Sequence, residues 1–163
     1  MFNIDEYVRY GAKGVFQVKE IIKKKNMQNK TTSYYVLCSN FDGLNTKIIT
    51  PVDNNTLRAI ISKKEVLQLI DAMPSVEVTW NEDKRLRENG FKEILASGQL
   101  KSLAQMIKSI HFTQQDKLKI NKDISESDKQ LFKNAENLLF EEISVSCEIK
   151  KDEVLDFILS KAS

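Results

Sequence analysis

The residues that could carry out catalysis or hold a metal ion are few in this chain. Among its 163 residues there is one histidine, His111, so neither a two-histidine metal site nor an H-E-x-x-H zinc motif can be assembled. The five glycines, at positions 11, 14, 43, 90 and 98, form neither a Walker A loop nor a dinucleotide-binding fingerprint. We therefore expect a protein that is not an enzyme, with no cofactor, no metal and no small-molecule substrate.

The carboxylate pairs and the two cysteines also lack the spacing of an active site. The pairs at 82–83 and 141–142 are adjacent in the chain, and neighbours on a helix point about 100° apart, so they do not converge as an acid–base pair would. We expect these pairs to lie on solvated helix faces. Cys38 and Cys147 have no C-x-x-C spacing, which indicates two reduced structural thiols in a reducing compartment.

The remaining side chains of interest are suited to contact nucleic acid or protein. Trp80 is the only tryptophan, and the cations Lys84, Arg85 and Arg87 follow it closely enough to contact phosphates beside it. Acidic residues interleave with these cations, so a mixed solvated face is the alternative. One interpretation of Trp80 is an aromatic that packs within the protein just before a helix.

The distribution of charge separates the two parts of the chain. Residues 1–52 carry eight Lys/Arg against four Asp/Glu, a net +4, and residues 53–163 carry seventeen against nineteen, a net −2. The C-terminal part is therefore not expected to bind DNA non-specifically through a strongly basic surface.

The composition, 41% hydrophobic and 29% charged, is that of a folded globular protein. No apolar run approaches the about 18 residues needed to span a bilayer, and we expect a cytoplasmic protein without membrane contact.

The elements that must position these side chains begin with strands. Alternating or β-branched runs at 7–10, 15–19, 34–38, 47–50 and 58–61 predict four or five short strands. A polar, lysine-rich stretch from 23 to 33 predicts the tip of a hairpin. Short strands joined by tight turns indicate a small SH3- or Tudor-like β-barrel.

From Ser62 onward the hydrophobic period becomes that of helices. A capping box at Ser62-x-x-Glu65 precedes a first helix that ends at Pro74, and a second helix is predicted from about Trp80 to Ser97, weakened at Gly90. Further helices are predicted around 103–110, after a cap at 125, and at 152–159. The fold class is therefore α+β, a small N-terminal β-barrel followed by an all-helical domain of about five helices. We divide the chain into domains at 1–52 and 62–163, with 53–61 as the join or last strand.

Several segments, taken in order, resemble the CarD/CdnL family of bacterial transcription regulators. The opening FNIDEYVRYGAKGV at 2–15 resembles the family's "F..GD.VVY...GV" start, and YYVL at 34–37 and TPV at 50–52 resemble its central strands. Trp80, LASG at 95–98 and ISESDKQLFKNAENLLFEE at 124–142 resemble its "W…L.SG…LS..EK..L..A..LL..E" pattern. The likeness covers nearly the whole chain in collinear order.

The resemblance implies a Tudor-like domain that docks on the β subunit of RNA polymerase. It also implies a helical domain that touches promoter DNA at the upstream edge of the melted region, where a tryptophan acts as a minor-groove wedge and alters open-complex stability. The candidate polymerase-binding residues are Lys24, Lys25, Lys47 and Ile49. The candidate DNA-binding residues are Trp80, Lys84, Arg85, Arg87 and Lys129.

The chain departs from the family pattern in three respects. Asp5 stands where the family has a glycine. Trp80 lies four residues further from the LASG motif than the family's tryptophan, so Lys84 occupies the wedge position and Trp80 lies about one helical turn away. The acidic balance of the helical part weakens generic attraction to phosphates.

Two alternatives stay open at this point. One is a reader of peptides or modified lysines, in which Tyr10, Phe16, Tyr34 and Tyr35 would form an aromatic cage. The other keeps polymerase binding but has no direct DNA contact, so that the helical part is a spacer or a protein-docking surface.

Overall fold

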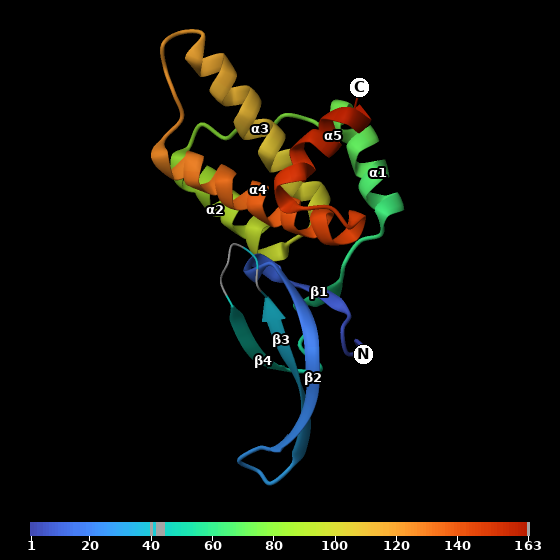
Figure 1. Ribbon diagram of the computed structural model, residues 1–163. Coiled ribbons are helices and arrows are strands. Elements are labelled where there is room, and N and C mark those ends of the chain that lie inside the picture. Colours follow the sequence, from blue (N-terminus) through green and yellow to red (C-terminus); the bar gives the residue numbers. More distant parts are fainter. Residues whose placement is uncertain (40, 42–44, 163) are drawn as a thin grey trace. The chain divides into compact units, whose positions relative to one another are not determined.

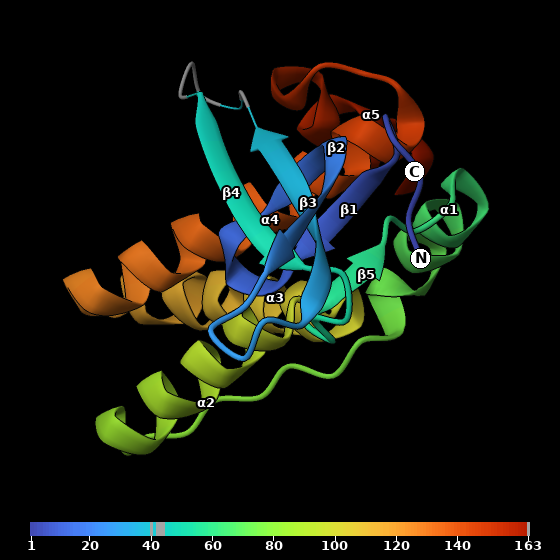
Figure 2. The same ribbon diagram turned by 90° about the horizontal axis from the view of Figure 1, so that it is seen from below.

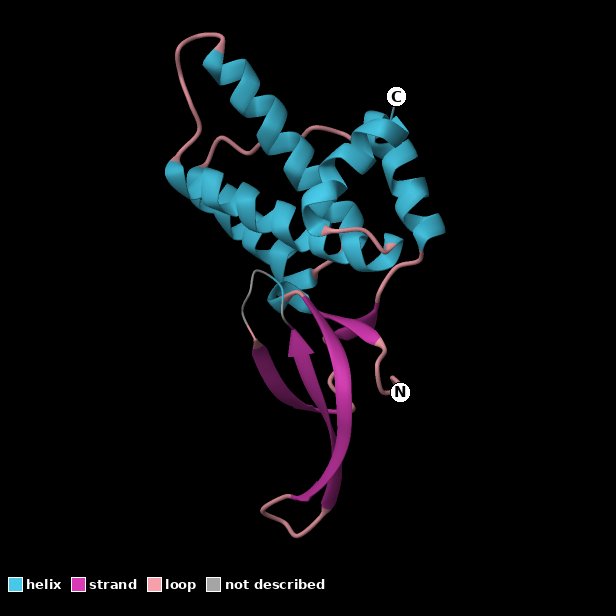
Figure 3. Cartoon of the chain, in the orientation of Figure 1, coloured by secondary structure: helices cyan, strands magenta, loops and turns pink. Residues whose placement is uncertain are grey.

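The computed structural model describes residues 1–39, 41 and 45–162, which belong to two compact units (Figure 1). The first unit comprises residues 1–60 and the second residues 61–163. The described part of the first is built mainly from strands and the second from helices (Figure 3). Each unit has its own cluster of buried hydrophobic side chains. The expected fold class, a β module followed by a module of five helices, is confirmed.

Five antiparallel strands form the sheet of the first unit: β1 (Tyr7–Tyr10), β2 (Val15–Lys25), β3 (Thr31–Ser39), β4 (Thr46–Pro51) and β5 (Leu57–Ala59). Their order is β4-β3-β2-β1-β5, so β4 and β5 are the two edges (Figure 2). No pairing joins β4 to β5 among the described residues, and the sheet stays open where the sequence predicted a barrel. β5 is short, and its three residues pair with β1 on one side.

A side-chain bridge stands where barrel closure was expected. The Asn54 amide nitrogen donates to the hydroxyl of Tyr10 at 3.0 Å and to that of Thr50 at 2.8 Å. Asn54 thereby ties the turn between β4 and β5 to the ends of β4 and β1. The segment 53–61, predicted as the join between domains, contains this turn and β5, and all but Ile61 belongs to the first unit.

The hairpin formed by β2 and β3 is longer than predicted. Pairing continues to Lys24 opposite Thr32 and Lys25 opposite Thr31, so both lysines lie in a strand and not in the loop at the tip. The Asn26 side chain makes this possible, because its Oδ1 accepts hydrogen bonds from the amides of Gln28 and Lys30 and closes a tight turn.

Asp5 fills a backbone conformation that usually selects glycine. Its φ is 70°, in the left-handed region, and its amide donates to the carbonyl of Val18 at 2.7 Å. This is the position at which the family pattern has glycine. Aspartate is among the residues that tolerate this region best, so the first turn is retained.

Five α-helices make up the second unit: α1 (Lys63–Ala72), α2 (Lys84–Ser97), α3 (Leu100–Leu118), α4 (Glu126–Cys147) and α5 (Val154–Ala162). Capping boxes form at Ser62 with Glu65 and at Ser125 with Asp128, and Gly98 ends α2 with a φ of 64°. α2 passes through Gly90 without a break. It begins at Lys84, not at Trp80, because the side chain of Asp83 caps it by accepting from the amide of Leu86 at 3.0 Å.

The segment ahead of α2 is held against α3. The Lys108 ammonium group donates to the carbonyls of Met73, Pro74 and Val76, at 2.8, 3.1 and 2.7 Å. The hydroxyl of the next residue, Ser109, accepts from the amide of Thr79 at 2.9 Å. These bonds explain why the chain stays extended as far as Trp80, and they set the place from which the Trp80 side chain projects.

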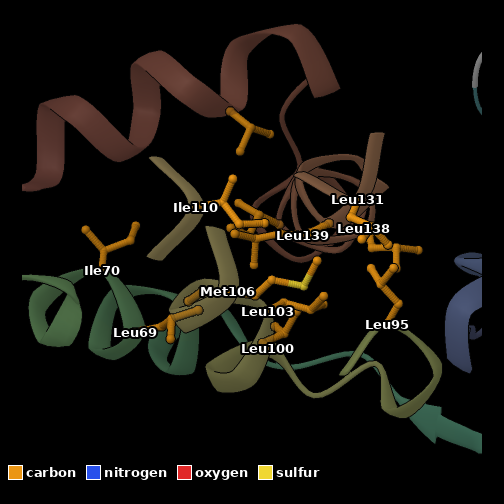
Figure 4. Close-up of a cluster of buried hydrophobic side chains, with 14 of the residues drawn as sticks. Leu69, Ile70, Leu95, Leu100, Leu103, Met106, Ile110, Leu131, Leu138 and Leu139 are labelled. Carbon is orange, nitrogen blue, oxygen red and sulfur yellow. The ribbon is translucent and has the colours of Figure 1, made fainter. Parts of the chain in front are cut away.

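The core of the second unit lies between α3 and α4, with α1, α2 and α5 packed around them. Leu103, Met106 and Ile110 of α3 are at most 1% exposed, and they meet leucines from α4 (Figure 4). Burial of such side chains contributes on the order of 2 kcal/mol each. The core therefore fixes the positions of the helix surfaces that could contact a partner.

The prediction that the carboxylates at 141–142 lie on a solvated face is wrong. Glu141 is 9% exposed and Glu142 is 0% exposed. The amide of Ile61 donates to a carboxylate oxygen of Glu142 at 3.4 Å, and the hydroxyl of Ser146 donates to the carbonyl of Ile61 at 2.6 Å. These polar groups of α4 anchor the first residue of the helical unit.

Of the helices in the described ranges, none combines the length and the apolar character needed to cross a bilayer.

Candidate nucleic-acid and polymerase interfaces

Trp80 is half-buried and packs on the core of the helical unit. Its ring lies 6.2 Å from that of Phe91, centroid to centroid, and the guanidinium carbon of Arg87 lies 4.3 Å from its centroid on one face. The indole Nε1 is buried and donates to no group of the described chain. A minor-groove wedge would need an exposed ring, so in this structure Trp80 is an aromatic that packs just before a helix.

Arg87 was predicted to face DNA, and the structure instead places it in the interior, 9% exposed. Its Nε and Nη2 donate to the two carboxylate oxygens of Asp128 at 3.1 and 2.9 Å, a bidentate pair that joins α2 to α4. Its Nη1 donates to the carbonyl of Asn81 at 2.9 Å. Planar, two-point binding of a carboxylate is the geometry for which arginine is suited, and here it uses three of the five N–H donors together with the bond to Asn81.

The Asp128 carboxylate is held in its ionised form. Burial alone would raise the pKa of Asp128, but hydrogen bonds from Arg87 and Ser125 and the charge of Arg87 outweigh burial, so the pKa lies below its ordinary value. The Ser125 hydroxyl donates at 2.7 Å. The ion pair and the cap of α4 are therefore one network, and it fixes the position of Trp80 through Arg87.

Lys84 and Arg85 are the exposed cations of the DNA candidates. Both lie in the first turn of α2, and the Lys84 ammonium lies 3.9 Å from the Glu88 carboxylate, with the Lys84 side chain 61% exposed. Arg85 has no ion pair within the described ranges. Both side chains are exposed, and their contact with phosphates stays a prediction.

Lys129 is tied into a surface ion-pair network. Its ammonium group lies 3.0 Å from Asp123 and 3.0 Å from Glu126. Hydrogen bonds to these two carboxylates raise the pKa of Lys129, and the bond from Lys129 lowers the pKa of Asp123. The charge of Lys129 is largely balanced in the free chain, and DNA would have to displace two carboxylates to use it.

A surface groove runs beside the start of α2. Its volume is about 550 Å³. Residues 79–82, which include Trp80 and the exposed Glu82, line one side, and five residues of α2 line the other: Leu86, Arg87, Gly90, Phe91 and Ile94. Leu86 is 58% exposed. The groove therefore has both polar and apolar lining, and its apolar side chains lie next to Lys84 and Arg85 in the chain.

The polymerase candidates of the first unit are all exposed. Lys47 and Ile49 lie two apart on the edge strand β4 and therefore on one face, opposite Cys38 and Val36 of β3, and Ile49 is 46% exposed. Lys24 and Lys25 lie on β2 in the part of the hairpin that extends beyond β1. The structure places the two pairs on different strands, each accessible to a partner.

The aromatic-cage alternative is wrong. Tyr35 is 0% exposed and Phe16 is 3% exposed, and both belong to the core of the first unit. Tyr10 packs on Phe16 and is bonded to Asn54, and a hydrogen bond with Thr50 is the main cause that lowers the pKa of Tyr10. The four rings named in the prediction therefore do not form an open cage.

Sequence reasoning missed two residues of the site. Asp128 was not among the candidates, because its partner Arg87 is 41 positions away and no local pattern links them. Leu86 did carry a signal that could have found it, because it lies five residues before Phe91 and therefore off the buried stripe of α2.

The comparisons with protein families cover almost the whole chain. Residues 2–63 match the CarD-like/TRCF RID domain, and residues 65–159 match the CarD C-terminal domain. No curated protein gives a significant match. The two matched domains follow one another in the order in which the β unit and the helical unit occur. The chain therefore belongs to the CarD family, whose members are transcription factors that interact with RNA polymerase.

Proposed function

We propose that the chain regulates transcription initiation by binding the β subunit of RNA polymerase through its first unit and promoter DNA through its second. The DNA contact would fall at the upstream edge of the melted region and change the stability of the open complex. The observation that carries this proposal is the division of the chain into two units with separate cores, because each unit can then present its own surface.

The open edge of the sheet supports the polymerase contact. An edge strand can add a strand of a partner by backbone pairing, and its exposed side chains then set the specificity. β4 offers Lys47 and Ile49 for this purpose, and Lys24 and Lys25 add charge on the hairpin. The net charge of +4 over residues 1–52 suits an acidic partner surface.

The start of α2 supports the DNA contact. Lys84 and Arg85 are exposed there beside an apolar groove. Minor-groove proteins combine such features, since cations hold the phosphates while an apolar side chain enters a base step. An apolar group inserted at the edge of the bubble opposes reannealing and so lengthens the life of the open complex.

Binding to purified polymerase tests the first half of the proposal. The double variant Lys47→Glu/Ile49→Glu should reduce co-purification with core polymerase by about tenfold or more, because it reverses one charge and places another where an apolar contact is expected. Leu159→Glu/Lys161→Glu is the matched control on exposed residues of α5 and should bind normally. If the wild-type chain does not bind polymerase at all, the proposal is wrong.

A second candidate function is polymerase binding without DNA contact. It is favoured by the burial of Arg87 against Asp128 and by the two carboxylates that balance Lys129. The variant Lys84→Ala/Arg85→Ala separates the two functions, because it removes the free cations without touching the core. An open-complex lifetime equal to that with the wild-type chain, at equal polymerase occupancy, would support this second candidate.

A further inference from the structure

The groove beside α2 is kept open by a glycine that the fold does not need. Gly90 has ordinary helical backbone angles, as it is absent from the positions with positive φ, and a Cβ built there meets no atom within 4 Å. A glycine inside a helix costs about 1 kcal/mol relative to alanine. Neither a turn, nor a close approach, nor packing accounts for it. Because Gly90 has no side chain, the groove has open space above α2 at this position.

Leu86 stands at the mouth of this space. It lies one helical turn before Gly90 on the same face, and Ile94 lies one turn after. Leu86 is exposed, whereas Trp80 is packed beneath Arg87 and against Phe91 with its Nε1 buried. The side chain that is free to enter a partner without disturbing the core is therefore Leu86.

The charges beside the groove indicate what the partner is. Lys84 and Arg85 precede Leu86 directly and are exposed. Three carboxylates lie near these cations. Asp83 is occupied as the cap of α2, and Glu88 accepts a hydrogen bond from Ser127 of α4 and lies 3.9 Å from the Lys84 ammonium, while Glu82 lines the groove itself and is exposed. An apolar wedge with two adjacent cations and an aromatic-lined groove matches a nucleic-acid backbone with an unstacked base.

We infer that Leu86 is the side chain that enters the base step at the edge of the melted promoter, and that the groove over Gly90 receives the base it displaces. Trp80 then forms the wall against which that base lies and is itself not the wedge. This inference rests on the proposed function, and it reassigns the residues that perform it.

Two variants of the full chain test the inference in open-complex lifetime measurements with polymerase, on a promoter carrying 2-aminopurine at the upstream edge of the bubble. Leu86→Ala should reduce the lengthening of the lifetime by about tenfold, since it removes most of the inserted apolar group. Gly90→Leu should give a similar loss and should abolish the change in 2-aminopurine fluorescence that the wild-type chain produces, because it fills the groove, while raising the melting temperature of the helical unit. Asn89→Leu, one position away and outside the groove, is the matched control and should behave as the wild type.

The outcomes distinguish the inference from the proposed function. If Leu86→Ala and Gly90→Leu both act like the wild type while the wild type lengthens the lifetime, the inference is wrong and the proposed function stands. If only Gly90→Leu retains full activity, no base enters the groove and that half of the inference is wrong. If the wild-type chain binds polymerase without any change of lifetime, the proposed function itself fails.

Discussion

The candidate lysines of the β unit and Arg87 of the helical unit lie in opposite environments, although burial of a cation is not confined to one unit, since Arg9 of the β unit is also 0% exposed. In the β unit, Lys24, Lys25 and Lys47 project from strands into solvent, where they add nothing to the core and are available to a partner. In the helical unit, Arg87 is built into the interior, where it joins α2 to α4 through Asp128 and covers one face of Trp80. The contrast teaches that the burial of a basic residue indicates whether it supports the fold or is available to a partner. Mutation of a buried one should lower stability, and mutation of an exposed one should affect binding.

The largest expected effect is that of Arg87→Ala. It leaves the Asp128 carboxylate buried without its partner, and breaking a buried ion pair in this way typically costs about 3–5 kcal/mol of the free energy of unfolding. The measurement is urea unfolding followed by the fluorescence of Trp80, which is the only tryptophan and lies in the helical unit. Lys84→Ala is the control on the same helix and should change the free energy by less than about 0.5 kcal/mol. A decrease in the free energy of unfolding of less than about 1 kcal/mol for Arg87→Ala would contradict the structural role of Arg87.

A smaller effect is expected from acid. The pKa of Asp128 is lower in the folded chain than in the unfolded chain, so its contribution to stability is fully present above the unfolded value of about 4 and is lost as the pH falls through the folded value. The helical unit should therefore lose stability more steeply below about pH 4 in the wild type than in Asp128→Asn. Parallel acid profiles for the two proteins, measured by Trp80 fluorescence, would contradict this.

Asp5→Gly should give a small gain in the β unit. The left-handed φ of 70° favours glycine, while glycine also loses more backbone entropy on folding, so we expect a net stabilisation of about 0.5 kcal/mol. Unfolding followed by tyrosine fluorescence measures it, because all four tyrosines, at 7, 10, 34 and 35, lie in this unit. A decrease in the free energy of unfolding would mean that the Asp5 side chain stabilises the β unit by more than its left-handed backbone conformation destabilises it.

The smallest effect on stability should come from the polymerase-binding variant Lys47→Glu/Ile49→Glu. Both side chains project from the exposed face of β4, so the free energy of unfolding of the β unit should stay within about 0.5 kcal/mol of the wild type. Near-unchanged unfolding together with lost polymerase binding would sharpen the contrast with Arg87. A large drop in stability would show that these residues support the fold and that the binding result cannot be attributed to the interface.

The parts of the structure that sequence could predict are those governed by local rules. The exposed face of β4 followed from the period of two in a strand, and the starts of α1 and α4 followed from the capping boxes at 62 and 125. The strand β2 was underestimated because its lysines were read as a loop, whereas the side chain of Asn26 closes a turn tight enough to let the strands continue.

The parts that sequence could not predict depend on distant partners. α2 begins four residues late because Lys108 and Ser109 of α3 hold the preceding segment extended. Trp80 is packed and Arg87 is buried because of Asp128, which no spacing rule connects to either residue. A tertiary ion pair thus accounts for the environment of two of the five DNA candidates.

The open edge of β4 has a consequence for the protein before it meets a partner. A strand with an unpaired row of backbone groups can also pair with the same strand of a second molecule, which is the usual route to ribbons and aggregates. Lysine on the exposed face and proline at the strand end are the features that discourage such self-pairing, and β4 has Lys47 and Pro51. The charge of Lys47 would then oppose self-association of the free protein. A neutral residue at this position would lower the solubility of the protein and promote aggregation, whether or not the chain binds polymerase.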